Sequence, residues 1–134
     1  MNRPARGQLW LIDDSPDHHL VTAATARRAD WDFAGFADGD SALAALAAGG
    51  RPAVVLMDFF IGEERGDLVT AAWRQLEPAG YRATIVGFSS VRAGSLRILA
   101  AGGDVMLAKR GGPDGVNPDL LAWLTAKKPK AGTG

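Results

Sequence analysis

The sequence predicts a doubly wound α/β fold, in which helices cover both faces of a parallel sheet of five strands. Five short apolar runs alternate along the chain with five segments whose apolar residues have helical spacing. One of these runs, residues 53–57, has no polar interruption, which is typical of a central strand buried on both faces. With 134 residues and no long unstructured insert, the chain fits one compact domain.

The first strand and helix are predicted from an apolar run and a capping sequence. Residues 9–12 are apolar and end at Asp13 and Asp14, and Ser15 and Pro16 then provide an N-cap and a first-turn proline for a helix. We expect one side of that helix to be buried, formed by Leu20, Val21 and Ala24.

A second strand and helix follow directly. Residues 31–36 alternate apolar side chains with Asp32 and Gly35, which suits an outer strand, and residues 38–40 predict a turn and a helix cap. The helix ends at a pair of glycines at 49 and 50. We expect its inward side to be Leu43, Leu46 and Ala47.

Three more strands and helices complete the alternation. The strands are predicted at residues 53–57, 84–88 and 105–107, and a loop over residues 59–66 follows the first of them. The helix after that loop is expected to face inward with Val69, Ala72, Trp73 and Leu76. The next helix is short, and its inward side is expected to be Leu96, Leu99 and Ala100. The last helix starts at Asn117 and Pro118, and its inward residues are Leu120, Trp123 and Leu124.

The composition argues against several classes of function. The 15 basic and 15 acidic side chains leave no net charge, whereas nucleic-acid or membrane-surface binding needs concentrated Lys and Arg. The absence of cysteine removes disulfides and thiolate chemistry, and no segment resembles a signal peptide or a transmembrane helix. We therefore expect a cytoplasmic protein with one domain over residues 1–134, a core at about 8–126 and a flexible tail at 127–134.

Polar side chains gather where the predicted strands end. Asp13 and Asp14 follow the first strand, Asp58 follows the third, Ser89 follows the fourth, and Lys109 lies just beyond the fifth. The carboxyl ends of parallel strands meet at one edge of the sheet, where ligands bind in open α/β folds. We therefore expect these five side chains to converge on one site.

Three clustered carboxylates need a positive partner. Two carboxylates about 4 Å apart repel by roughly 4 kcal/mol at an effective dielectric constant near 20. Lys109 is one candidate partner, and a hard divalent cation is the other. Mg²⁺ binds one or two carboxylates and fills the rest of its shell with water and phosphate oxygens. This combination is typical of phosphoryl transfer in which a carboxylate is the nucleophile.

The motifs at these strand ends resemble those of the receiver domain of two-component response regulators, of the stand-alone, single-domain type. The resemblance covers residues 8–123. It depends on the order and spacing of four groups: residues 11–16, residues 55–58 with Gly66 downstream, residues 85–90, and residues 101–109. It implies the flavodoxin-like strand order 2-1-3-4-5, with five helices.

The resemblance also implies roles in binding metal and accepting phosphate. Asp58 matches the aspartate that is phosphorylated by a histidine kinase, a histidine phosphotransfer protein or a small phosphodonor. Asp14 matches the acid that binds Mg²⁺ directly, and Asp13 matches the one that reaches it through water. Phe60 matches the residue whose backbone carbonyl binds the ion together with Asp58.

Two further positions match the switching residues of such domains. Ser89 matches the hydroxyl that moves onto the phosphoryl group, and Lys109 matches the lysine that pairs with that group. Phosphorylation would then be a local charge change that biases the surface from the fourth helix to the fifth strand.

Several positions depart from the receiver pattern and are expected to modulate the output. Met106 stands where the pattern has an aromatic residue on the fifth strand, so an aromatic switch is absent or relocated. Arg110 replaces the proline after the lysine, and a trans bond is expected because a cis bond without proline costs about 3–4 kcal/mol. The loop over residues 111–116 is longer than usual, and Gly62 replaces another proline.

Four other side chains lie near these motifs: Phe60, Val91, His18 and His19. Phe60 and Val91 are bulky and apolar and lie beside the expected path of the hydrolytic water, so we expect them to slow loss of the phosphoryl group. His18 and His19 are interpreted as solvated surface residues, because adjacent residues do not share a helix face.

Three functions remain open at this level. The first is a response regulator that accepts phosphate on Asp58 with Mg²⁺ and acts through an unknown downstream protein, since no effector domain follows the last helix. The second is a pseudo-receiver that binds partners without phosphorylation, which Met106 and Arg110 favour slightly. The third is a phosphatase with an aspartyl nucleophile, although Phe60 occupies the place of its usual second acid.

Overall fold

The computed structural model describes residues 7–112 and 114–127. In chain order its elements are β1 (Gln8–Ile12), α1 (Pro16–Arg28), β2 (Asp32–Phe36), α2 (Gly39–Ala47), β3 (Val54–Met57), β4 (Phe60–Ile61), β5 (Glu64–Arg65), α3 (Gly66–Leu76), β6 (Thr84–Gly87), α4 (Arg92–Ala100), β7 (Val105–Met106) and α5 (Pro118–Ala126). The tail predicted at 127–134 lies outside the described residues from position 128 onward.

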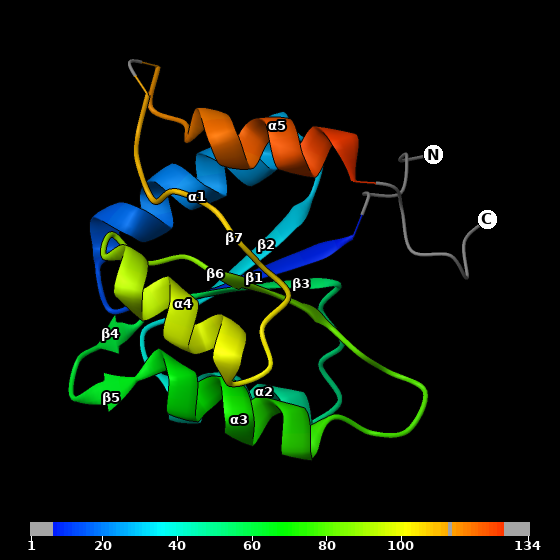
Figure 1. Ribbon diagram of the computed structural model, residues 1–134. Coiled ribbons are helices and arrows are strands. Elements are labelled where there is room, and N and C mark those ends of the chain that lie inside the picture. Colours follow the sequence, from blue (N-terminus) through cyan, green and yellow to red (C-terminus); the bar gives the residue numbers. More distant parts are fainter. Residues whose placement is uncertain (1–6, 113, 128–134) are drawn as a thin grey trace, which may run out of the picture.

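The sheet has five parallel strands in the order β2-β1-β3-β6-β7 (Figure 1). This confirms the predicted order 2-1-3-4-5, because β4 and β5 form a separate antiparallel hairpin and shift the numbering. That hairpin lies inside residues 59–66, where the sequence predicted only a loop. All four residues of β3 are buried, as expected for the central strand.

Helices cover both faces of the sheet, so the fold has three layers. Helices α1 and α5 lie on one face, and α2, α3 and α4 lie on the other (Figure 1). The alternation within β3 serves both sides: Val54 and Leu56 pack towards α1 and α5, while Val55 and Met57 pack towards the other three helices. The described residues therefore contain two apolar layers, one on each face of the sheet. Polar groups lie at the edge of the sheet between these layers.

Helix caps follow the local sequence closely. Ser15 and Asn117 are the N-caps of α1 and α5, each followed by a proline in the first turn. Asp38 is the N-cap of α2, and its carboxylate accepts a hydrogen bond from the Ser41 N–H at 2.7 Å. These contacts satisfy N–H groups that have no partner inside the helix, and they confirm the predicted helix starts.

Three predicted inward leucines, Leu20, Leu76 and Leu96, are instead exposed. Leu76 is the last residue of α3 and is 47% exposed. Ala47 and Ala100, also predicted to face inward, are exposed as well.

Leu20 of α1 is 71% exposed, and the residues buried on that helix are Thr22, Thr25 and Ala26. Thr25 tolerates burial because its hydroxyl donates to the Val21 carbonyl and accepts from the Asn117 N–H. Leu96 of α4 is 46% exposed, because that helix approaches the sheet through the smaller Gly94 and Ser95, with Ile98.

A network of ion pairs connects α3 to the segments that contain β6 and precede β7. Arg74 donates to Asp104 Oδ2 at 2.9 Å, Arg82 donates to Asp104 Oδ1 at 2.8 Å, and the Ile85 N–H donates to Asp104 Oδ2 at 2.9 Å. Burial of the carboxyl would raise its pKa, but the Ile85 N–H and the two guanidinium groups outweigh burial and hold the pKa of Asp104 below its ordinary value.

Asp104→Asn is expected to lower the free energy of unfolding at pH 7 by about 1–3 kcal/mol. Because the pKa of Asp104 is lower in the folded than in the unfolded protein, its stabilisation is full above about pH 4 and is lost as the pH falls through the folded value. Urea unfolding of both proteins at pH 7 and below pH 4 measures this difference. Asp32→Asn, at an exposed position, is the control, and an equal loss at both pH values would contradict the prediction.

Within the ranges 7–112 and 114–127, no helix combines the length and apolar character that crossing a membrane requires.

Candidate functional site

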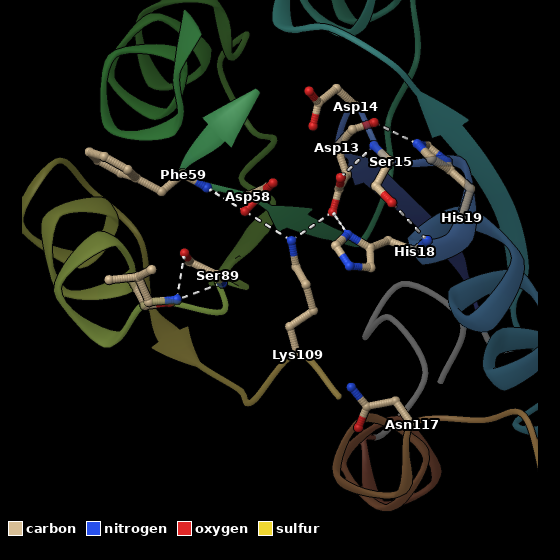
Figure 2. Close-up of polar contacts among 12 residues, drawn as sticks. Asp13, Asp14, Ser15, His18, His19, Asp58, Phe59, Ser89, Lys109 and Asn117 are labelled. Atoms are coloured by element: carbon tan, nitrogen blue, oxygen red, sulfur yellow. Dashed lines mark hydrogen bonds and ion pairs between the residues drawn. The ribbon is translucent and has the colours of Figure 1, made fainter. Parts of the chain in front are cut away.

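The site lies at the carboxyl edge of the sheet, where neighbouring strands end. Asp13 follows β1, Asp58 follows β3, Ser89 follows β6, and Lys109 comes from the segment beyond β7. Figure 2 shows that Asp13, Asp58 and Lys109 point toward one another across this edge. Asp13 is fully buried, and Asp58 and Ser89 are each 7% exposed. The predicted convergence of strand ends is therefore observed.

Lys109 bridges the two buried carboxylates. Its Nζ lies 2.7 Å from Asp13 Oδ2 and 2.9 Å from Asp58 Oδ1. The lysine side chain is only 6% exposed and also lies over the Phe88 ring, 5.8 Å from its centroid. One ammonium group thus compensates the charge of two buried carboxylates. Charges interact strongly where water is excluded, so removal of the ammonium group would leave both carboxylates unpaired.

The lysine affects the two carboxyl groups unequally. Burial raises the pKa of Asp13, but the hydrogen bonds from Lys109 and the Ser15 N–H, together with the charges of Lys109 and His18, lower it below its ordinary value. Burial also raises the pKa of Asp58, and there the Lys109 contact does not outweigh burial and the nearby charge of Asp13. The pKa of Asp58 therefore lies above its ordinary value, whereas that of Asp13 lies below it.

Asp14 completes a group of three acids suited to a metal ion. It is exposed, and one ligand atom from each of Asp13, Asp14 and Asp58 lies within 4.8 Å of the others. Asp14 Oδ2 accepts a hydrogen bond from the Gly62 N–H at 3.0 Å. Hard oxygen donors at this spacing, one of them open to solvent, fit a hard divalent cation such as Mg²⁺. Phe60, the fourth predicted metal residue, begins β4 two residues after Asp58.

The two oxygens of Asp58 have different surroundings. Oδ1 accepts hydrogen bonds from the Phe59 N–H at 2.8 Å and from Lys109. Among the residues that the structure describes, none donates a hydrogen bond to Oδ2, so this oxygen is available for chemistry. The backbone of Asp58 packs closely against Gly66, because a Cβ at Gly66 would lie 1.9 Å from the Asp58 carbonyl oxygen.

Ser89 lies at the same edge, but its hydroxyl is directed elsewhere. Ser89 Oγ accepts a hydrogen bond from the Val91 N–H at 3.1 Å, and the Ser89 N–H donates to Ser95 Oγ at 3.1 Å. The serine is thus held against the start of α4.

Phe60 and the three positions expected to modulate the output, Val91, Met106 and Arg110, lie around this centre. Phe60 is 59% exposed and its ring meets Phe59 edge-on, while Val91 is the N-cap residue of α4 and is 47% exposed. Arg110 donates to both carboxylate oxygens of Asp119 on α5 at 2.9 and 3.0 Å, and its bond to Lys109 is trans, as predicted.

Met106 lines a cavity beside the lysine. The cavity has a volume of about 360 Å³ and extends from the end of β6 to the segment after β7. Its walls are Ser89, Ser90, Arg92, Ser95, Met106, Leu107, Ala108 and Lys109. Met106 thus lines open space beside Ser89 and Lys109.

His18 and His19, which the sequence indicated as solvated surface residues, are partly exposed, but both also contact Asp13. His18 Nδ1 donates to Asp13 Oδ2 at 2.9 Å, and His19 Nε2 donates to the Asp13 backbone carbonyl at 2.6 Å (Figure 2). His19 fits because β2 has Gly35 there, where a Cβ would lie 2.1 Å from the imidazole. The position of the two histidines in the first turn of α1 could have predicted these contacts, because side chains there point back toward the start of the helix.

Comparisons with known proteins give structural matches only. No protein-family model matches the sequence, and no curated protein matches it. The Mn²⁺-bound form of response regulator Rcp1 matches with a TM-score of 0.75 and 19% identity, over 93% of this chain and 99% of that chain. A CheY-like response regulator receiver domain from Methylobacillus flagellatus matches with a TM-score of 0.70 and 17% identity, over 87% and 97%.

A third match is a response regulator from Burkholderia pseudomallei, whose structure contains a phosphorylated aspartic acid, a calcium ion and citrate. Its TM-score is 0.66 and its identity 22%, over 80% of this chain and 62% of that chain. At such identities these matches establish a shared fold, and the chemistry has to be argued from the residues of the site.

Proposed function

We propose that this chain, which has the fold of response regulator receiver domains, accepts a phosphoryl group on Asp58 in two-component signalling. The observation that carries the proposal is the cluster in which Lys109 joins Asp13 and Asp58 while Asp14 completes three acids within 4.8 Å. We place the protein in the cytoplasm, with a histidine kinase or histidine phosphotransfer protein as its donor and a downstream protein as its target.

A bound Mg²⁺ would neutralise the oxygens of the incoming phosphoryl group and help to align it with the carboxylate. The residues that would hold it are Asp14 and Asp58 directly, Asp13 through water, and Phe60 through its backbone carbonyl. The structural likeness to Mn²⁺-bound and Ca²⁺-bound response regulators supports a divalent cation at this place.

The chain itself positions the nucleophile and receives the charge. Asp58 Oδ2 attacks the phosphorus, and the donor leaves with the electrons of its bond to phosphorus, so that an acyl phosphate remains on Asp58. Lys109 then pairs with the phosphoryl group, and the Ser89 hydroxyl turns from the Val91 N–H to a phosphoryl oxygen. That rotation releases a contact at the start of α4, which is the first step of the output.

Intact-mass measurement after incubation with Mg²⁺ and acetyl phosphate tests the proposal. The wild-type protein is expected to gain one phosphoryl group, and Asp58→Asn is expected to gain none, because the nucleophilic oxygen is replaced by an amide. Chelation of Mg²⁺ should also abolish the gain. A wild-type protein that gains nothing from acetyl phosphate or phosphorylated donor proteins would instead be a pseudo-receiver, and steady turnover of a phosphorylated substrate would indicate a phosphatase.

Phe60→Asn is expected to speed loss of the phosphoryl group several-fold. The exposed Phe60 ring beside Asp58 shields the acyl phosphate from water, whereas an amide would hydrogen-bond the attacking water and bring it nearer. The decay of phosphoprotein after removal of the donor measures the rate. Leu96→Asn, exposed on α4, is the matched control, and an unchanged decay in Phe60→Asn would end the shielding hypothesis.

A further inference from the structure

A groove between α2 and α3 carries features that phosphoryl transfer does not use. It has a volume of about 330 Å³, and its apolar walls are Leu43 of α2 and Leu68, Val69 and Ala72 of α3. The remaining residues that line it are Asp40 and three residues of the β4–β5 hairpin segment, Glu63, Glu64 and Arg65. We propose that this groove binds a basic amphipathic helix of a partner protein.

The apolar part of the groove contains a leucine side chain that a partner could bury. Leu68 is 62% exposed although its neighbour Val69 is 5% exposed and packs into the core. Covering an exposed leucine removes apolar surface from water and so stabilises a complex. Because α2 has 9 residues that rise about 1.5 Å each, a helix of two to three turns can lie along it. Leucines at helical spacing would be the anchors of such a partner.

The charges around the groove select a basic partner. Asp40, Glu63 and Glu64 line it together with a single cation, Arg65. That cation is already paired, because Arg65 Nη2 lies 2.6 Å from Asp67 Oδ2. The groove therefore presents negative charge around an apolar floor, which attracts Lys and Arg and repels nucleic acid.

The hairpin connects this groove with the acids of the site. Gly62 at its turn donates to Asp14 Oδ2 at 3.0 Å, and Glu64 Oε1 accepts from the Gly39 N–H at the start of α2 at 2.8 Å. A partner in the groove would thus contact a segment that also holds Asp14. This link, which rests on the proposed function, predicts that Mg²⁺ changes the affinity of the groove.

Selection from a displayed library of helical peptides with random charge tests the groove in the unphosphorylated full chain. The enriched peptides are expected to carry net positive charge and leucines at helical spacing. One synthetic peptide from this set is then titrated by fluorescence anisotropy. Leu68→Glu and Glu63→Lys should each weaken its binding about tenfold or more, and Leu96→Glu, at an exposed position of α4, should leave it unchanged.

Three results would overturn the groove proposal: no enriched peptide, enriched peptides without net positive charge, or unchanged binding by both groove variants. Thermal unfolding of the variants shows whether they are folded, and Glu63→Lys, at an exposed hairpin position, provides an independent test of Leu68→Glu. The Mg²⁺ link is tested by repeating the titration with the ion. Equal affinity with and without Mg²⁺ would overturn the link but not the groove, and it would not bear on phosphorylation of Asp58.

Discussion

A Lys109→Met protein is expected to have a free energy of unfolding about 3–5 kcal/mol below that of the wild type in Mg²⁺-free buffer. The substitution removes the ammonium group that lies 2.7 Å from Asp13 Oδ2 and 2.9 Å from Asp58 Oδ1. Both carboxylates are nearly buried, so neither can regain full hydration. The apolar methionine side chain keeps much of the lysine stem's volume, and the loss therefore reports charge more than packing.

Urea unfolding with and without Mg²⁺ measures this effect. Mg²⁺ should restore part of the stability of Lys109→Met, because the folded acids bind the ion and the unfolded chain does not. Lys109→Arg should lose less than Lys109→Met, since the charge is kept, and Arg97→Met at an exposed position of α4 is the control for removing a surface cation. Equal stability of Lys109→Met and the wild type would show that the lysine does not compensate these acids.

Gly66→Ala is the second substitution with a large expected effect. A Cβ at this position would lie 1.9 Å from the Asp58 carbonyl oxygen, so the backbone of Asp58 or the start of α3 has to move. We expect a loss of stability of about 1–3 kcal/mol. We also expect phosphorylation of Asp58 to slow by about 100-fold, because a displacement near 1 Å is enough to misalign a nucleophile.

The initial rate of phosphorylation by acetyl phosphate and a urea unfolding curve check this prediction. Gly111→Ala is the matched control, because nothing lies within 4 Å of a Cβ at that glycine and its backbone is not in the left-handed region. Phosphorylation of Gly66→Ala at the wild-type rate would mean that the Asp58 backbone is free to shift without loss of function.

The sequence predicted the parts of this molecule that depend on local pattern and on topology. The helix starts at Ser15, Asp38 and Asn117 depend on neighbouring residues, and the structure has the caps there. The convergence of Asp13, Asp58 and Lys109 follows from one rule, that parallel strands present their carboxyl ends at one edge. Neither inference needs knowledge of side-chain packing.

The parts that were missed depend on tertiary contacts. The burial of Thr25 in place of Leu20 depends on a hydrogen bond from Asn117, which is distant in the sequence. The exposure of Leu96 depends on how closely α4 approaches the sheet, a distance that helical periodicity does not contain. The direction of the Ser89 hydroxyl is a rotamer set by the Val91 N–H.

The hydrogen bonds to Asp13 and Asp14 make one side of the site rigid and the other side movable. Asp13 is fully buried and accepts from Ser15, His18 and Lys109, so its carboxylate is held from three directions. Asp14 is exposed and accepts from the Gly62 N–H of the hairpin. When a ligand binds at Asp58, the Asp13 carboxylate therefore stays in place and the Asp14 carboxylate can move. Because Asp14 is bound to Gly62, its movement displaces the hairpin.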